Sequence, residues 1–276
     1  RDRSVSRGLG DVYKRQALVQ SFQNPYLKKL ASSYFLEDKA FVKKFCFHSA
    51  AKSVHHGFVG GLLEHTLSVM KLCDFYTKSY PALNRDLLLT AALFHDMGKP
   101  AAAFFEETDE GPVEHFYGHA VISTQLACGI MHRLPFPAWL RRDVPSLVRA
   151  HDDVVPPNAR AVRRMLGRLG GRTDLFAALC DIKRADALAQ APFCAPRADT
   201  ADELRALMEQ ILEDEAAFTV KHLAIDGRDI IALGVPAGPE VGRLLDACLD
   251  AVIDERVPNE HEALLAFAEE LRKEAS

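Results

Sequence analysis

Residues 86–100 read DLLLTAALFHDMGKP and contain the strongest structural signal in the chain. Apolar residues occupy nearly every position before the histidine, which predicts a helix that is buried on all sides. The Gly98-Lys-Pro sequence is a typical helix end, so we expect this central helix to span 86–97. His95 and Asp96 then lie in its last turn, where a buried carboxylate is costly unless it is paired or bound to a metal.

The composition of the whole chain also favours helices, because 38 Ala and 34 Leu stand against 35 Val, Ile and Thr together. Apolar residues recur at helical spacing between Pro, Gly and Asn breaks, and Asn84 is a suitable N-cap for the central helix. This pattern predicts further helices near 25–35, 38–47, 60–80, 117–133, 137–151, 158–169, 173–190, 200–217, 227–233, 239–254 and 259–274, with a turn at 108–112. We therefore predict an all-α protein.

Charge and cysteine usage exclude several classes of protein. The net charge is −4, which gives no global field for holding a nucleic-acid backbone. The longest strongly apolar stretch, 87–94, is far shorter than the roughly 20 residues of a membrane span. The six Cys are scattered without a C-x-x-C pair, which favours free thiols over a thiolate zinc site. We expect a soluble cytoplasmic protein with no membrane partner.

Histidine and aspartate residues recur about once per predicted helix. Helices packed about 8–10 Å apart can direct side chains from several elements at one place. Imidazole and carboxylate ligands suit Mn, Fe, Ni, Co or Zn, and Mg less comfortably. We therefore predict a divalent-metal site with one or two ions, in which a bridging carboxylate at Asp96 is expected if there are two. The predicted ligands are His65, His95, Asp96, His119, His151 and Asp186.

The pattern His65, His95-Asp96, Asp186, with HDMGKP at 95–100, resembles the HD superfamily of metal-dependent phosphohydrolases. The resemblance implies a helical HD-domain bundle in which His65, His95, Asp96 and Asp186 hold the first ion. It implies that His119 and His151 hold a second ion or contact phosphate. Asp96 and Lys99 are the predicted catalytic residues; Lys99 would neutralise a substrate phosphate, or else is an ordinary cation at a helix end.

Two branches of this superfamily are recognisable in different parts of the chain. Residues 24–98 resemble the HD domain of bacterial 3′→5′ exoribonucleases, and residues 99–276 resemble the HD and tail regions of bacterial CCA-adding tRNA nucleotidyltransferases. The two likenesses meet at 95–99, so a chimera joined there is one interpretation. Neither a nucleotidyltransferase head nor the alternating strands of an OB-fold is recognisable ahead of residue 60, so nucleotide addition is not predicted.

The domain organisation expected from these patterns has three parts. Residues 1–16 read like a translated adaptor and are excluded as a non-native tail. Residues 24–190 form the HD phosphohydrolase domain, and 199–276 form an appended C-terminal helical module. Arginines at helical spacing make a basic stripe that contacts RNA or is simply a solvated face. The candidate RNA-binding residues in this stripe are Arg160, Arg163 and Arg164.

The function predicted from the sequence is metal-dependent hydrolysis of a phosphate ester in a nucleotide or at an RNA 3′ end, such as that of tRNA. The alternative is a non-catalytic tRNA- or RNA-binding fragment with a structural metal. The sequence leaves the substrate, the metal, the choice between mono- and diesterase, and the oligomeric state open.

Overall fold

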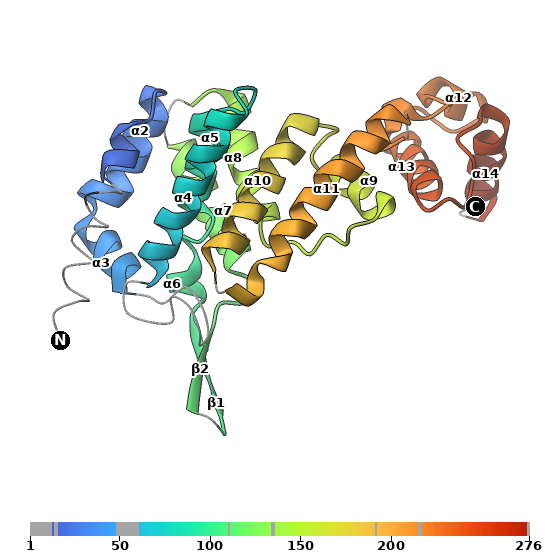
Figure 1. The fold of residues 1–276 in the computed structure, drawn as a ribbon. Helices are drawn as coiled ribbons and strands as arrows, with labels where there is room; N and C mark the ends of the chain where they lie inside the picture. Colours follow the sequence, from blue (N-terminus) through green and yellow to red (C-terminus); the bar gives the residue numbers. More distant parts are fainter. Residues whose placement is uncertain are drawn as a thin grey trace. The chain divides into compact units, whose positions relative to one another are not determined.

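A computed structural model describes residue 13 and residues 16–47, 61–109, 111–133, 136–190, 192–214 and 217–274. Most of the adaptor-like stretch 1–16, and residues 48–60 of the exoribonuclease-like stretch, lie outside these residues. The elements, labelled as in Figure 1, are α2 (Pro25–Ser32), the π-helix η1 (Ser33–Glu37), α3 (Lys39–Phe47), α4 (Gly61–Ser79), α5 (Arg85–Phe94), α6 (Lys99–Ala102), β1 (Phe104–Thr108), β2 (Gly111–His115), α7 (His119–His132), α8 (Ala138–Ala150), α9 (Ala159–Arg168), α10 (Thr173–Ala189), the 3₁₀-helices η2 (Pro192–Cys194) and η3 (Val220–His222), α11 (Pro196–Glu213), α12 (Gly227–Ala232), α13 (Pro239–Ile253) and α14 (His261–Glu274).

The all-α prediction is confirmed, because the described residues form helices with a single small two-stranded sheet. The predicted helices all occur, with ends within a few residues of those expected. The sequence does not predict α6 or the two strands of the β-hairpin. The strands flank the predicted turn at 108–112. All five residues of β1 are exposed, so β1 lacks the alternation of buried and exposed residues by which a strand is recognised.

Helix α5 is the centre of the N-terminal part of the chain, as its sequence predicts. Every residue from Asp86 to Phe94 is buried, and the helix contacts α2, α4 and α8. The side chain of Asn84 accepts a hydrogen bond from the backbone N–H of Leu87 at 3.0 Å, so the predicted N-cap is present. Burial of an entire apolar helix gives the residues at its end a fixed position.

Helix α5 ends three residues earlier than predicted, at Phe94. Tight turns replace the last helical turn, with hydrogen bonds from Met97 N to Phe94 O at 3.2 Å and from Lys99 N to Asp96 O at 3.0 Å. Short α6 follows directly and contacts α7. The chain therefore turns sharply at 95–98, and His95 and Asp96 lie at this turn.

The chain divides into two compact units. The N-terminal unit comprises 1–153 and 177–202, and the C-terminal unit comprises 154–176 and 203–276. Helix α9 thus groups with the C-terminal unit, where it contacts α13, although the sequence-based division placed it within the HD domain. Leu244, Cys248 and Leu264 are among the residues that form the core of the C-terminal unit.

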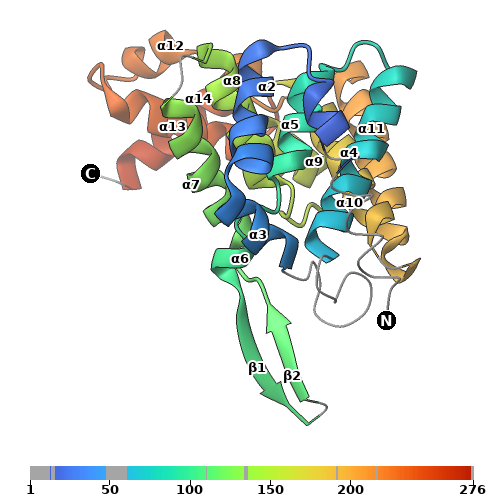
Figure 2. The ribbon, with the colours of Figure 1, turned by 90° about the vertical axis from the view of Figure 1, so that its left-hand side faces the viewer.

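The β-hairpin extends from the helices of the N-terminal unit beside α6, as both ribbon views show (Figures 1 and 2). Its strands are antiparallel, and Phe104 pairs with His115 at the end nearest the helices. Lys99 opens α6 just before the hairpin, and His119 opens α7 just after it. Among the described helices, each is too short or too polar to span a bilayer.

Candidate metal centre

The six predicted ligands converge on one buried cluster in the N-terminal unit. His65 lies in the first half of α4, Asp186 near the end of α10, and His95 and Asp96 at the turn after α5. The cluster is completed by two ring nitrogens from α7 and α8, since His119 is the first residue of α7 and His151 caps the end of α8.

Asp96 is the centre of the cluster, because its two carboxylate oxygens face two different groups of histidines. Oδ2 lies 3.4 Å from His65 Nε2 and 3.3 Å from His95 Nε2. Oδ1 lies 3.2 Å from His119 Nε2 and 3.7 Å from His151 Nε2. This arrangement matches the expectation for a carboxylate that bridges two ions.

Each group contains ligand atoms close enough to share an ion. His65, His95 and Asp96 form one set, and Asp96, His119 and His151 form the other, with all ligand atoms of a set within 4.8 Å of one another. Asp186 adds to the first set, since its Oδ1 lies 3.0 Å from His65 Nε2. Nitrogen and oxygen donors without thiolate suit divalent transition metals, so the residues present suit the ions expected.

Backbone carbonyls orient three of the histidine rings. The Nδ1–H of His95 donates to Ala92 O at 2.6 Å, that of His119 to Phe116 O at 3.0 Å, and that of His151 to Val148 O at 2.7 Å. A proton held on Nδ1 leaves the Nε2 lone pair available as a ligand. All three Nε2 atoms lie in the cluster around Asp96.

The electrostatics keep the carboxylates ionised. Burial acts to raise the pKa of Asp96, but electrostatic interactions with His95 and Lys99 and hydrogen bonds to His119 and His151 hold it well below its usual range. Burial lowers the pKa of His95, which favours the neutral imidazole that binds metals. Burial also acts to lower the pKa of His65, but hydrogen bonds to Asp186 and Asp96 outweigh it and raise that pKa to about 9.

Lys99 lies in the same cluster rather than on an exposed helix end. Its Nζ donates to Asp96 Oδ2 at 2.6 Å, and the residue is only 8% exposed. The ammonium group also lies 5.8 Å from the centre of the Phe116 ring. A cation held beside the central carboxylate is well placed for an anionic ligand, although its predicted role with phosphate stays a prediction.

Two residues that sequence reasoning missed support the predicted ligands. Lys183 Nζ donates to the carbonyls of His151 at 2.7 Å and Asp153 at 2.6 Å. Gln190 donates to Asp186 Oδ2 at 2.8 Å, which leaves Oδ1 facing the histidines. Both residues lie one helical turn from Asp186, and this spacing alone could have identified them.

The predicted RNA-binding arginines form ion pairs within the C-terminal unit. Arg160 and Arg164 each lie 2.7 Å from Asp254 Oδ1, and their side chains are 58% and 42% exposed. Arg163 is buried and donates to the carbonyl of Ile253 at 3.1 Å. These contacts join α9 to the end of α13, and RNA binding by the arginines stays a prediction.

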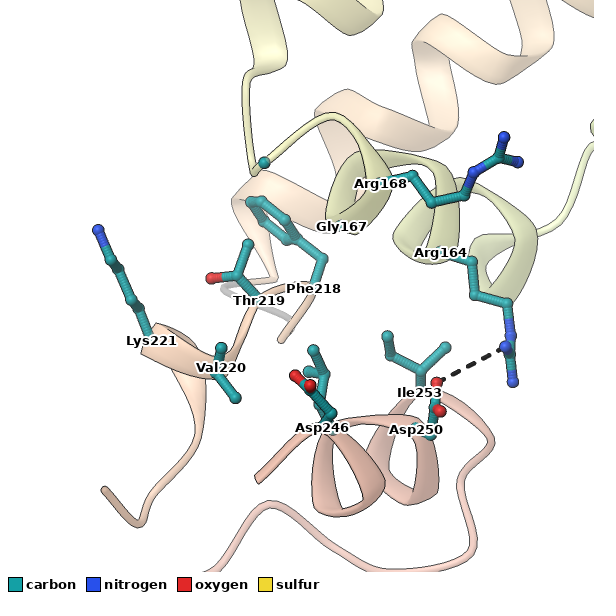
Figure 3. Close-up of a pocket in the computed structure, with 12 residues that line it drawn as sticks. Arg164, Gly167, Arg168, Phe218, Thr219, Val220, Lys221, Asp246, Asp250 and Ile253 are labelled. Atoms are coloured by element: carbon teal, nitrogen blue, oxygen red, sulfur yellow. Dashed lines mark ion pairs between the residues drawn. The ribbon is translucent and has the colours of Figure 1, made fainter. Parts of the chain in front are cut away.

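A cavity of about 740 Å³ lies in the same unit, between α9, the segment 218–221 and α13. Figure 3 shows Arg164 directed toward Asp250, with Lys221 on the opposite side of the cavity and Phe218 between them. The Arg164–Asp250 ion pair spans 3.6 Å. Arg168 also lines the cavity, so its walls carry both basic and acidic groups.

Comparison with known proteins finds similarity in two stretches of the chain. Residues 62–191 match the HD domain family model, and this range contains all six residues of the cluster. Residues 186–268 match the model for tRNA nucleotidyltransferase domain 2 (putative). Residues 62–191, with the HDMGK motif and its distant partners, are thus similar to the HD domain family, and the region that follows is similar to tRNA nucleotidyltransferases.

Individual relatives are of two kinds, tRNA nucleotidyltransferases and 3′-5′ exoribonucleases. The CC-adding tRNA nucleotidyltransferase of Thermus thermophilus is 34% identical over 213 residues, which are 76% of this chain and 45% of the relative. The A-adding tRNA nucleotidyltransferase of Deinococcus radiodurans is 32% identical over 176 residues, 60% of this chain and 38% of the relative. The 3′-5′ exoribonuclease YhaM of Geobacillus sp. is 38% identical over 81 residues, 29% of this chain and 24% of the relative.

Both predicted resemblances are confirmed, with one adjustment. The chain spans less than half the length of these relatives. The likeness to the Thermus enzyme covers 213 residues, whereas only 178 residues follow residue 98. It therefore begins before the HDMGK motif rather than after it, so a single relative spans the position at which a chimeric join was considered.

Proposed function

We propose that the chain is a metal-dependent phosphohydrolase that acts on a nucleotide or on the phosphate ester at an RNA 3′ end. The observation that carries the proposal is the position of Asp96, whose two oxygens each face a separate pair of histidines. We propose two divalent ions: His65, His95, Asp96 and Asp186 would hold one, and Asp96, His119 and His151 the other. Divalent ions make hydroxide available near neutral pH and offset charge on phosphate oxygens.

The side chains of the chain perform the remaining tasks in this proposal. Lys99 adds a positive charge beside Asp96, where it offsets the charge that develops on a phosphate in the transition state. Asp152, with its carboxylate 3.9 Å from His119 Nδ1 and its side chain 62% exposed, provides an acceptor for a proton at the edge of the cluster. Burial of the cluster excludes bulk water and strengthens these interactions.

An RNA 3′ end as substrate is supported by two different kinds of relative. Thermus and Deinococcus relatives are named as tRNA nucleotidyltransferases, and the Geobacillus relative as a 3′-5′ exoribonuclease. We therefore propose that the substrate of this chain is the 3′ end of a tRNA or of another RNA.

Hydrolysis by matched variants tests the proposal. The wild-type protein should hydrolyse bis-p-nitrophenyl phosphate or 2′,3′-cyclic nucleotides when Mn, Ni, Co or Mg is added. Asp96→Ala should reduce kcat by at least about 10³-fold, because it removes the carboxylate shared by both groups of histidines. Asp109→Ala, a change of an exposed carboxylate in the hairpin turn, should leave kcat unchanged. Equal turnover by wild type and Asp96→Ala would rule the proposal out.

A second candidate function is RNA binding without catalysis, which the mixed-charge cavity of the C-terminal unit favours. Lys221 and Arg168 line that cavity and are exposed, so they suit contact with phosphates. Under this alternative, Lys221→Glu weakens tRNA binding and lowers its salt dependence, while Lys273→Glu, an exposed lysine of α14, does not. Salt-dependent tRNA binding by a protein without any hydrolase activity would favour this second function.

A further inference from the structure

Three aromatic rings meet at the base of the β-hairpin, where the hairpin joins the helices that carry the six predicted metal ligands. These six residues are called the metal cluster below. The ring centres of Phe104 and His115 are 5.2 Å apart with nearly parallel planes, and the Tyr117 ring lies 5.0 Å from His115 and 5.7 Å from Phe104. His115 is buried, whereas Phe104 is 44% and Tyr117 68% exposed. The cluster therefore has a buried side and an open side that presents aromatic surface.

The ring cluster is close to the metal cluster along the chain. His119 follows Tyr117 by two residues, so their Cα atoms are at most about 7.6 Å apart. Phe116, between His115 and Tyr117, accepts the Nδ1–H of His119 on its carbonyl and lies under the Lys99 ammonium group. Residues 115–119 thus carry side chains of both clusters, which places the rings beside the predicted metal site along the chain.

We propose that Phe104 and Tyr117 form a subsite that stacks against the base of the nucleotide whose phosphate is bound at the metal cluster. This inference rests on the proposed phosphohydrolase function and specifies its substrate: a nucleotide or a terminal nucleotide with an intact base, rather than a simple phosphate ester. Aromatic side chains stack on any base, so the subsite selects for a base without selecting its identity.

The charge of the hairpin limits the subsite to a terminal nucleotide. Beyond the rings, the strands and their turn carry Glu106, Glu107, Asp109 and Glu114. Glu106 is paired with His115 at 2.8 Å, but the group as a whole is acidic and would repel further phosphates. Binding of a long RNA strand along the hairpin is therefore disfavoured, whereas binding of a single base at the rings is not.

Equilibrium binding tests the subsite without depending on turnover. Adenosine 5′-phosphate and ribose 5-phosphate differ only in the base, and calorimetry on the metal-loaded protein gives the affinity for each. Since one stacking contact changes affinity by roughly 5- to 150-fold, the wild-type protein should prefer adenosine 5′-phosphate by a factor in that range. Tyr117→Ala should remove the preference and leave the affinity for ribose 5-phosphate and the metal content unchanged.

Two control variants separate stacking from a loss of structure. Tyr117→Phe keeps an aromatic ring and should keep the preference. Phe105→Ala removes a ring that is 67% exposed on the opposite face of β1, and should also keep it. Equal or unmeasurable affinity for the two ligands in the wild-type protein would overturn the subsite, as would equal losses in Tyr117→Ala and Phe105→Ala. Metal-dependent hydrolysis of bis-p-nitrophenyl phosphate by the same preparation would show that the proposed function stands regardless.

Discussion

Gly98 lies directly against α7, the helix that begins with the predicted ligand His119. A Cβ atom at this position would lie 2.5 Å from His119 O and 2.6 Å from Ser123 N, both of which are backbone atoms of α7. The Gly98 N–H also donates to Ser123 Oγ at 2.8 Å. The glycine of the HDMGK motif is therefore required for the close approach of α7, and this approach brings His119 to Asp96.

Gly98→Ala should move the first turn of α7 away and weaken binding of an ion by His119 and His151. We expect a loss of about 1–3 kcal/mol in the free energy of unfolding, typical of overpacking in a core, measured by urea denaturation. Gly129→Ala, in the exposed part of α7 with no atom near its added Cβ, should instead stabilise by about 0.5–1 kcal/mol. Similar stability of Gly98→Ala and wild type would show that α7 does not need this close approach.

A proton on His65 competes with a metal ion for the same nitrogen. Because Asp186 and Asp96 raise the pKa of His65 to about 9, the ring is protonated at neutral pH and must lose its proton when an ion binds. Metal affinity should therefore rise with pH, by up to about tenfold per unit, until the pH passes 9. The two carboxylates have lowered pKa values and stay ionised throughout this range.

Competition with a chelator at pH 7, 8, 9 and 10 measures this dependence. The expected sign follows from the raised pKa: the protonated form dominates below it, and the competing proton is lost above it. Affinity that is constant between pH 7 and 9, after correction for the chelator, would contradict the account of His65.

Among the secondary-structure elements, α10 holds the two halves of the metal cluster together. Asp186 belongs to the first set of ligands, and Lys183, one turn earlier, donates to the carbonyls of His151 and Asp153 at the end of α8. Carbonyls at a helix end have no partner within the helix, so a buried cation there satisfies them and interacts favourably with the helix dipole.

Lys183→Met keeps the length of the side chain and removes both hydrogen bonds. We expect a loss of about 2 kcal/mol in the free energy of unfolding, with a lower affinity for the second ion than for the first. Lys78→Met, which removes a 70% exposed lysine from an ion pair with Asp74, should change stability by less than about 0.5 kcal/mol. Loss of both ions to the same extent in Lys183→Met would contradict a role specific to the end of α8.

At the scale of the whole molecule, the helices and the residues of the His/Asp cluster could be predicted from the sequence, but the residues that support the cluster could not; metal binding by the cluster stays a prediction. Apolar periodicity locates α4 and α5 because burial repeats every turn, and His65 and Asp96 stand out because polar groups are costly on such faces. The sequence does not predict the β-hairpin, because β1 has no buried face and therefore no alternation of apolar and polar residues.

The division into compact units also depends on contacts that no local pattern reveals. Helix α9 precedes the second half of the N-terminal unit along the chain, yet its Arg163 is bound to the carbonyl of Ile253 in the C-terminal unit. The three arginines look like a basic stripe in the sequence, because periodicity gives the face of a helix but not the partner that covers it. Asp254, 90 residues away, is that partner for Arg164.

The metal content of the purified protein, determined by elemental analysis, tests the central claim most directly. The account predicts close to two divalent ions per chain in the wild-type protein, about one in His119→Ala, and almost none in Asp96→Ala, because the two carboxylate oxygens of Asp96 face both sets of histidines. A folded Asp96→Ala protein that retains its metal would contradict the bridging carboxylate on which the whole proposal depends.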